Sequence, residues 1–134
     1  MKYTHKVQYY ETDQMGVVHH SNYIRWFEEA RTEFLSAAGT PYAAMEEESI
    51  ISPVVEVECR YEKSTRFGET AEISVRISEL GNVRLTFEYE VTVNGEPRAR
   101  GRSIHCFINR EGRPIILKKE RPDLFEKIEG STEL

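Results

Sequence analysis

An apolar stripe along residues 22–38 restricts the fold more than any other feature of this sequence. Aromatic and small apolar side chains recur three or four residues apart, at Tyr23, Phe27, Ala30, Phe34 and Ala37. This spacing predicts an α-helix with a continuous buried face. Ile24, Trp26 and Leu35 lie off the stripe, so apolar surface extends around more of the cylinder than one solvent-facing helix needs. We therefore expect a central helix that other elements pack against on most sides.

Capping residues flank this predicted helix. Ser21 or Asn22 is expected to serve as its N-cap, because short polar side chains accept hydrogen bonds from the first free N–H groups of a helix. Gly39 followed by Pro41 is expected to end it.

The remaining segments alternate apolar and polar residues with the period of two that is typical of half-buried strands. They cover residues 55–62, 71–77, 83–93 and 98–108, and residues 3–10 suit a first strand. Asn94-Gly95 is a strong signal for a two-residue hairpin, and Pro122 is expected to open a short helix through about residue 128. The order of one strand, a long helix and about four antiparallel strands predicts an α+β protein, in a single domain spanning residues 1–134.

Charge and hydropathy exclude several classes of protein. The net charge of −5 argues against a nucleic-acid binder that works by bulk phosphate neutralisation. No stretch approaches the roughly 18 apolar residues of a membrane span, and the N-terminus lacks the apolar run of a signal peptide. Cys59 and Cys106 lie far apart and are interpreted as reduced thiols. The sequence therefore predicts a cytoplasmic protein with no nucleic-acid partner and no membrane span.

The loop before the helix carries an aspartate, Asp13, that has two interpretations. Asp-x-x-Gly, here Asp13 to Gly16, is common turn chemistry. Alternatively, the carboxylate acts as general base or nucleophile on an electrophilic carbonyl. The start of the helix supplies what such chemistry needs, because its first N–H groups lack intrahelical partners and the helix dipole adds partial positive charge there. The loop and the helix start together indicate an acyl-transfer site.

The adjacent histidines His19 and His20 raise the question of a metal. Adjacent histidines rarely point at one ion, and no H-x-x-x-H or cysteine partner follows at ligand spacing, so we expect no metal site. His20 could equally be a packed residue at the helix entrance. Asn22 and Tyr23 could be a cap and a core residue with no further role.

The segment from Tyr10 to Arg31, Y-E-T-D-Q-M-G-V-V-H-H-S-N-Y-I-R-W-F-E-E-A-R, resembles the signature of the 4-hydroxybenzoyl-CoA thioesterase-like branch of the hotdog superfamily. That branch also holds acyl-CoA thioesterases associated with the Tol-Pal system. The matching positions are Asp13, Gly16, Val17, Val18, His19, His20, Ser21, Asn22, Tyr23, Phe27, Glu28, Ala30 and Arg31. A weaker resemblance continues through Y-E-K-S-T-R-F-G-E at residues 61–69.

This resemblance implies a hotdog fold, in which a curved antiparallel sheet of about five strands wraps a long central helix. It implies homodimers that join their sheets edge to edge and pair again into homotetramers. It also implies hydrolysis of an acyl-CoA thioester to the acid and free CoA, with no metal or organic cofactor. Asp13 matches the catalytic aspartate, as nucleophile or general base. His20 matches the position that offers its backbone N–H to the carbonyl, with a side chain that assists in the Tol-Pal-associated relatives.

The neighbouring positions of the motif are expected to bind substrate; they are Gly16, Val18, His19, Asn22 and Tyr23. Many relatives have tyrosine where this chain has His19, which bears on the preferred acyl group more than on the reaction. Glu11 is left out of the chemistry, because relatives vary at its position.

Cations are candidates for the phosphates of CoA. Lys63 and Arg66 lie in the segment of weaker resemblance, and Arg98, Arg100 and Arg102 share one strand face at a period of two. The alternative for this arginine row is cross-strand pairing with Glu88 and Glu90 of the preceding strand.

Two other functions remain open from the sequence. The same site could act on acyl groups carried by acyl carrier protein, which would require a basic docking patch. The chain could also be a non-catalytic acyl-CoA-binding protein that keeps the hotdog fold. The intact motif from Asp13 to Tyr23 argues against this second alternative, because binding alone needs no poised carboxylate.

Overall fold

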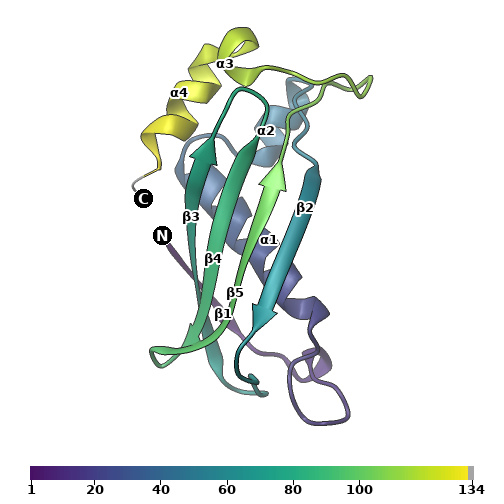
Figure 1. Cartoon of the computed structure of the whole chain (residues 1–134), viewed down its shortest axis with the longest axis vertical. Coiled ribbons are helices and arrows are strands. Elements are labelled where there is room, and N and C mark those ends of the chain that lie inside the picture. The colour runs from purple at the N-terminus through teal and green to yellow at the C-terminus, as the bar shows by residue number, and fades with distance from the viewer. Residues whose placement is uncertain (133–134) are drawn as a thin grey trace.

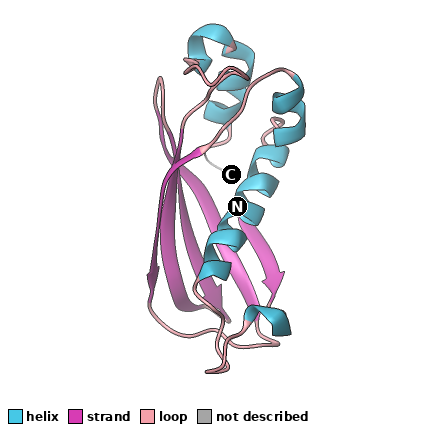
Figure 2. Ribbon diagram, turned by 90° about the vertical axis from the view of Figure 1, so that its right-hand side faces the viewer, coloured by secondary structure: helices cyan, strands magenta, loops and turns pink. Residues whose placement is uncertain are grey.

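The computed structural model describes residues 1–132 and has two layers, a sheet and a long helix. The five-stranded antiparallel sheet has the order β1-β3-β4-β5-β2 (Figure 1). Its strands are β1 (Lys2–Lys6), β2 (Val54–Tyr61), β3 (Thr70–Leu80), β4 (Leu85–Val93) and β5 (Glu96–His105). The long helix α1 (Ser21–Ala37) lies along one face of the sheet (Figure 2). The predicted α+β architecture is confirmed.

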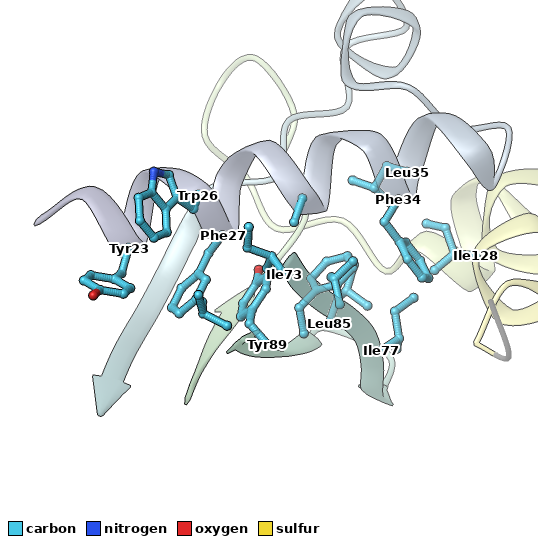
Figure 3. Packing of buried hydrophobic residues seen from close by; sticks show 14 of the residues in the cluster. Tyr23, Trp26, Phe27, Phe34, Leu35, Ile73, Ile77, Leu85, Tyr89 and Ile128 are labelled. Atoms are coloured by element: carbon cyan, nitrogen blue, oxygen red, sulfur yellow. The ribbon is translucent and has the colours of Figure 1, made fainter. Parts of the chain in front are cut away.

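Large side chains on several sides of α1 are buried, as its wide apolar surface predicted. Figure 3 shows Tyr23, Phe27 and Phe34 pointing from the helix toward the strands, while Trp26 and Leu35 lie along other sides of it. None of the five is more than 3% exposed. The ring of Phe27 stacks on that of Tyr89 with 4.3 Å between centroids. Gly101 makes this approach possible, because a Cβ there would lie 2.4 Å from the ring of Phe27. Ala37, by contrast, is exposed at the end of the helix.

Four short helices complete the described part of the chain. They are the 3-10 helix η1 (Tyr9–Glu11), α2 (Tyr42–Glu47), α3 (Leu117–Glu120) and α4 (Pro122–Gly130). Pro122 opens α4 as predicted, and Ile128 of this helix packs beside Phe34 at the far end of the core (Figure 3). Within the described residues no helix is long and apolar enough to cross a membrane.

The predicted strands exist, with corrected ends. The first was expected over residues 3–10, but β1 stops at Lys6 and η1 follows, because Gln8 and Glu11 close a reciprocal capping box around this short turn. The hairpin between β4 and β5 turns at Asn94 and Gly95, whose φ angles of 50° and 79° are both positive. Asn and Gly both tolerate positive φ, and the Asn-Gly pair therefore suits this two-residue hairpin turn.

Strand β2 differs from its neighbours because it forms an edge of the sheet. It pairs with β5 alone, from Tyr61 opposite Ala99 to Val54 opposite His105. Side chains of both faces are exposed, including 52% of Val55 and 41% of Val57. An edge strand with exposed valines is a template for pairing with another chain.

A buried polar network crosses the core between α1 and the sheet. Arg31 donates from Nε to the hydroxyl of Tyr42 (2.9 Å) and from Nη1 to that of Tyr89 (3.1 Å). The Tyr89 hydroxyl lies 2.6 Å from Ser103 Oγ, which lies 2.7 Å from His105 Nε2. Burial, and next the charge of Arg31, lowers the pKa of His105 to about 4. The imidazole is therefore neutral at physiological pH.

Candidate active site

The loop that carries Asp13 is a compact turn held at both ends. The backbone N–H of Asp13 donates to Val17 O (2.8 Å), and that of Gly16 donates back to Asp13 O (2.9 Å). Gly16 has a φ of 79°, which explains the glycine at this position. Thr12 and Val18 form an antiparallel bridge across the base of the loop. The loop therefore presents Asp13 from a defined backbone.

The side chain of Asp13 makes a turn contact with one of its two carboxylate oxygens. Its Oδ1 accepts the backbone N–H of Met15 at 2.8 Å, which is the turn role. Its second oxygen has no hydrogen-bond partner among the described residues. The residue is half-buried. One oxygen thus fixes the carboxylate, and the other is available to a substrate.

Asp13 faces a hollow of about 280 Å³ between the loop, the start of α1 and the end of β2, which we term the strand-side hollow. Its lining comprises Asp13, Met15, Val17, Val18, His20, Tyr23, Tyr61, Glu62, Lys63 and Ser64. The structure therefore brings together five residues proposed from the motif and its weaker extension: Asp13, Val18, His20, Tyr23 and Lys63.

His20 directly precedes α1 and lies exposed at the hollow. The next three N–H groups are engaged: Ser21 donates to His19 Nδ1 (3.2 Å), Asn22 to His19 O (3.0 Å) and Tyr23 to His20 O (3.3 Å). The N–H of His20 itself donates to no group in residues 1–132. A helix dipole favours negative charge at this end. This N–H is therefore a donor available to a carbonyl oxygen.

The predicted N-cap residues, Ser21 and Asn22, are corrected by the structure. The cap position is His20, which makes no capping hydrogen bond through its side chain, and Ser21 is already helical. Ser21 Oγ bonds His19 Nδ1 (2.8 Å), while Asn22 Nδ2 donates to Glu11 O (2.9 Å) and His19 O (3.3 Å). Both side chains turn back to the preceding loop instead of capping the helix.

Tyr23 lines the strand-side hollow and is held from behind by Thr65. Tyr23 is 3% exposed and donates from its hydroxyl to Thr65 Oγ1 at 3.0 Å. Thr65 O in turn accepts the backbone N–H of Val18 at 2.8 Å. These contacts give Tyr23 and Val18 a packing role, which was the alternative interpretation of Tyr23.

His19 and Asn22 lie on a second hollow, of about 730 Å³, which we term the helix-side hollow. It is lined by Tyr9, Tyr10, Thr12, Asp13, Gln14, His19, Ser21, Asn22 and Arg25. Asp13 lines both hollows and so lies on the ridge between them. His19 is exposed and stacks on His20 with 4.1 Å between ring centroids.

Lys63 and Arg66, the two cations from the segment of weaker resemblance, lie close to the loop. Lys63 reaches the strand-side hollow but pairs with Glu96 at 3.0 Å. Arg66 is exposed, and its Nη1 lies 3.5 Å from Gly16 O. Both cations remain accessible, with 62% of the Lys63 side chain exposed.

The arginine row on β5 is engaged within the chain. Arg98 makes two hydrogen bonds of 3.0 Å to Glu69 and one of 2.9 Å to Glu96, and its side chain is 11% exposed. These hydrogen bonds from Arg98 outweigh the effect of burial and hold the pKa of Glu69 below its ordinary value. This geometry gives Arg98 a structural role.

Arg100 and Arg102 also have carboxylate partners, on a different strand from the one considered. Arg100 pairs with Glu62 (2.8 Å) and Arg102 with Glu58 (2.9 Å). Both partners belong to β2 or directly follow it, whereas Glu88 of β4 pairs with Arg76 of β3. The expected cross-strand pairing exists, but with the other neighbouring strand.

Glu11, which the sequence left out of the chemistry, is buried beside the loop at 4% exposed. Its Oε1 accepts Gln8 N and lies 2.8 Å from His5 Nε2, and its Oε2 accepts Trp26 Nε1, each at 2.8 Å. Burial alone would raise the pKa of Glu11, but the hydrogen bonds from His5, Gln8 and Trp26 outweigh it, so the pKa lies below its ordinary value. A buried tryptophan N–H needs an acceptor, and that need was the available signal.

Tyr61 is the second residue that the motif did not single out. Its hydroxyl donates to His20 O at 3.1 Å, and its ring packs edge-on against that of Tyr23 at 5.2 Å. Burial, and next the Cys59 thiol, raises the pKa of Tyr61 to about 12, so the phenol stays a donor at neutral pH. The alternation of β2 placed Tyr61 on a face but gave no indication of this contact.

In the part of the chain that the structure describes, no three His, Cys, Asp or Glu side chains are grouped in a way that could hold a metal ion. His19 and His20 instead stack on each other. Cys59 and Cys106 are both free and half-buried.

Comparison with known proteins identifies the family. A family model described as the thioesterase-like superfamily matches residues 7–128. A Bacillus subtilis protein, YneP, named provisionally as an acyl-CoA thioesterase, is 35% identical over 120 residues, with 88% of this chain and 87% of that protein covered. The Escherichia coli acyl-CoA thioester hydrolase YbgC is 31% identical over 91 residues, covering 68% and 67%.

Solved structures agree with this result. The crystal structure of DHNA-CoA thioesterase from Staphylococcus aureus superposes with a TM-score of 0.92 at 33% identity, covering 96% of this chain and 88% of that one. A hypothetical protein from Thermus thermophilus superposes with a TM-score of 0.90 at 36% identity, covering 96% and 97%. The hotdog fold and the thioesterase class that the motif predicted are both confirmed. The chain belongs to the thioesterase-like superfamily.

Proposed function

We propose that this protein hydrolyses acyl-CoA thioesters to a carboxylic acid and free CoA, as one domain spanning residues 1–134. The observation that carries the proposal is the pairing of two unused groups at the strand-side hollow. One is the second carboxylate oxygen of Asp13, and the other is the backbone N–H of His20. A nucleophilic oxygen and a donor for a developing oxyanion are the two parts that acyl transfer requires.

In this mechanism the thioester carbonyl accepts the N–H of His20, and the dipole of α1 stabilises the charge that grows on its oxygen. Asp13 then acts in one of two ways. As nucleophile, it attacks the carbonyl carbon, the C–S bond breaks, CoA leaves as thiolate and takes up a proton, and water hydrolyses the acyl-aspartate. As general base, it accepts a proton from an attacking water, and that proton passes to the departing thiolate.

His20 and Tyr61 assist from the same hollow. The His20 side chain is exposed beside Asp13, where it can meet the substrate. Tyr61 holds the His20 carbonyl at 3.1 Å and thereby fixes the peptide that follows it. Gly16, Val18, His19, Asn22 and Tyr23 are proposed to shape the acyl site, through direct contact or through the loop.

The substrate class rests on the relatives' names, which specify acyl-CoA for YneP and YbgC and DHNA-CoA for the Staphylococcus aureus enzyme. For the nucleotide, Lys63 and Arg66 are better placed than the β5 row, because both are exposed near the loop. Arg98, Arg100 and Arg102 are held by carboxylates and are proposed only to contribute long-range positive charge.

The active unit is proposed to be a homodimer joined through β2, with dimers pairing into a homotetramer. β2 is an edge strand that pairs with β5 on one side only, and it has exposed valines. Tyr61 at its end lines the strand-side hollow. A second copy on this edge would therefore close the hollow. Light scattering of the purified protein tests the assembly, and Val57→Lys is expected to give monomers with lower activity.

A cytoplasmic location is proposed because both cysteines are free thiols, which is typical of reducing compartments. Comparing thiol release from matched acyl-CoA and acyl-carrier-protein substrates separates the two enzyme functions. CoA binding without thiol release across the panel would instead support a non-catalytic binding protein.

The direct test is a thiol-release screen over acyl-CoAs from acetyl to long-chain and aromatic, with Asp13→Asn as control. We expect turnover of at least one acyl-CoA class by the parent protein and its loss in the variant. Equal turnover by both proteins would contradict the mechanism.

A further inference from the structure

We propose that Glu11 is a positioning residue, which sets the distance between the Asp13 carboxylate and the His20 N–H. The proposal rests on the proposed function, because it concerns the geometry of the same site. Glu11 does not face the strand-side hollow, so it acts through the backbone and not on the substrate.

The side chain of Glu11 ties together the elements around the loop. Oε1 accepts the N–H of Gln8, in the turn before η1, and lies 2.8 Å from Nε2 of His5 on β1. Oε2 accepts the indole N–H of Trp26 on α1, also at 2.8 Å. One carboxylate thus joins β1, the short turn and the long helix at a single buried point.

The main chain of Glu11 holds the other end of the loop. Its carbonyl accepts the N–H of His19 at 2.8 Å and Nδ2 of Asn22 at 2.9 Å. The chain therefore leaves Glu11, runs through the Asp13 turn and returns to the same residue at His19. Asp13 comes two residues after this anchor, and His20 comes one residue after the return.

The positions of the Asp13 carboxylate and the His20 N–H therefore both depend on Glu11. A shift of its carbonyl moves His19, and with it the N–H of His20, relative to the carboxylate of Asp13. Rates of acyl transfer are sensitive to such shifts, since a displacement of about 1 Å can cost roughly 10²-fold. Glu11 is well suited to resist a shift because donors from three elements converge on it.

The site requires a carboxylate and not an amide. The N–H groups of Gln8 and Trp26 point at opposite oxygens. A glutamine has one acceptor oxygen and one donor NH₂, so one of these N–H groups would face another donor. Glu11→Gln therefore preserves the volume of the side chain while disrupting its anchoring.

The experiment measures thiol release by Glu11→Gln on the best acyl-CoA of the screen, together with thermal unfolding and inhibition by free CoA. We expect kcat to fall about 10–100-fold, while KM and the inhibition constant for CoA change less than about threefold. A purely structural role would lower the unfolding temperature and leave kcat per folded molecule unchanged, which would overturn the proposal.

Glu29→Gln is the matched control. Glu29 lies 3.2 Å from the other ring nitrogen of His5 but makes no hydrogen bond to the loop. We expect its kcat to equal that of the parent protein. If Glu29→Gln loses as much kcat as Glu11→Gln, the loss arises from the changed charge around His5, and the proposal is overturned.

Asn22→Ala keeps the test available if Glu11→Gln does not fold. It removes the 2.9 Å bond to the Glu11 carbonyl and the 3.3 Å bond to the His19 carbonyl, and it leaves the carboxylate untouched. We expect the same pattern, a lower kcat with a retained KM, but a smaller loss because His19 N–H still holds the carbonyl. A parent-like kcat in the folded variant would contradict the proposal.

Combination with Asp13→Asn separates this inference from the mechanism. If Glu11 acts through Asp13, the double variant has no lower kcat than Asp13→Asn alone. Further loss of kcat in the double variant would overturn the positioning role. If Asp13→Asn retains parent activity, the proposed mechanism fails. If Asp13→Asn is inactive but Glu11→Gln keeps parent kcat, the mechanism stands and the positioning role alone is wrong.

Discussion

Two polar clusters in this molecule contain similar groups but differ in access. In the core, Ser103 Oγ lies 2.7 Å from His105 Nε2, a spacing that also occurs in nucleophile–base pairs. Both residues are 0% exposed, and the Ser103 hydroxyl also contacts the Tyr89 hydroxyl. At the loop, Asp13 and His20 line an open hollow. Only the second cluster can receive a substrate.

The clusters also differ in the use of their hydrogen-bonding groups. The core network is a chain from Arg31 through Tyr89 and Ser103 to His105. At the loop, one oxygen of Asp13 and the N–H of His20 have no partner within the described residues. Buried hydrogen-bonded networks stabilise a fold, whereas catalysis needs a fixed, accessible group with hydrogen-bonding capacity left over. Substitutions in the core should therefore change stability, and substitutions at the loop should change rate.

The largest expected effect on stability comes from His105 and depends on pH. Its pKa is about 4 in the folded protein and near 6.5 when unfolded. Between those values the unfolded state alone takes up a proton, so the free energy of unfolding falls as the pH is lowered from 6.5 to 4, by about 3 kcal/mol from this residue. Urea unfolding across this pH range measures the slope.

His105→Gln, which does not titrate, should remove most of that slope. An unchanged pH dependence in this variant would show that the slope arises elsewhere, for example from Glu11 and Glu69, whose pKa values lie below their ordinary values. Those carboxylates lose their contribution below the ordinary pKa of a glutamate, near 4.5, so the two sources act in largely different pH ranges.

Ser103→Ala should have the next largest effect. It removes one of the two partners of the Tyr89 hydroxyl and the partner of buried His105 Nε2, which is left unpaired. We expect the free energy of unfolding to fall by about 2 kcal/mol, with kcat unchanged. Chemical denaturation and thiol release on the same preparation provide both values. A large drop in kcat would show that the core network also contributes to the reaction, which would contradict the proposed separation of stability from rate.

Tyr61→Phe should have a smaller effect, on rate. The variant loses the hydroxyl that donates to His20 O, while the ring and its contact with Tyr23 remain. Loss of one such hydrogen bond, worth about 1 kcal/mol, corresponds to a reduction in kcat of roughly fivefold. Steady-state kinetics measures this loss. A fully active variant would show that Tyr61 contributes through the packing of its ring and not through its hydroxyl.

Arg102→Gln should have the smallest effect. Its ion pair with Glu58 is well exposed, with 44% and 59% of the two side chains accessible. Exposed pairs of this kind contribute about 0.5 kcal/mol or less. We also expect less than a twofold change in KM for acyl-CoA. A larger rise in KM would indicate that the arginines of β5 contact CoA. Lys63→Gln, measured beside it, is the comparison variant near the loop.

Most of the fold could be predicted from hydrophobic period. The long helix was correct to within one residue at each end, and β4 and its Asn94-Gly95 turn followed from alternation and turn chemistry. These features depend on neighbours in the sequence. The end of β1 was wrong because the chain turns at Gln8 to satisfy the Glu11 carboxylate.

The candidate site was only partly predictable, because some of its contacts join residues that are not neighbours in the sequence. Asp13 and His20 lie in one short motif, so the sequence could pair them. Glu11 depends on contacts with His5 and Trp26, and Tyr61 contacts His20 from a residue 41 positions later in the chain. Contacts of this range are set by packing, which a pattern of residues along the chain does not specify.

The most direct test of the account compares Asp13→Asn with Ser103→Ala in one experiment, measuring kcat for thiol release and the free energy of unfolding. Asparagine keeps an oxygen to accept the Met15 N–H, so the turn should survive. We predict that Asp13→Asn lowers kcat at least about 10³-fold with stability unchanged, and that Ser103→Ala does the reverse. A variant of Asp13 that retains parent kcat would contradict the account.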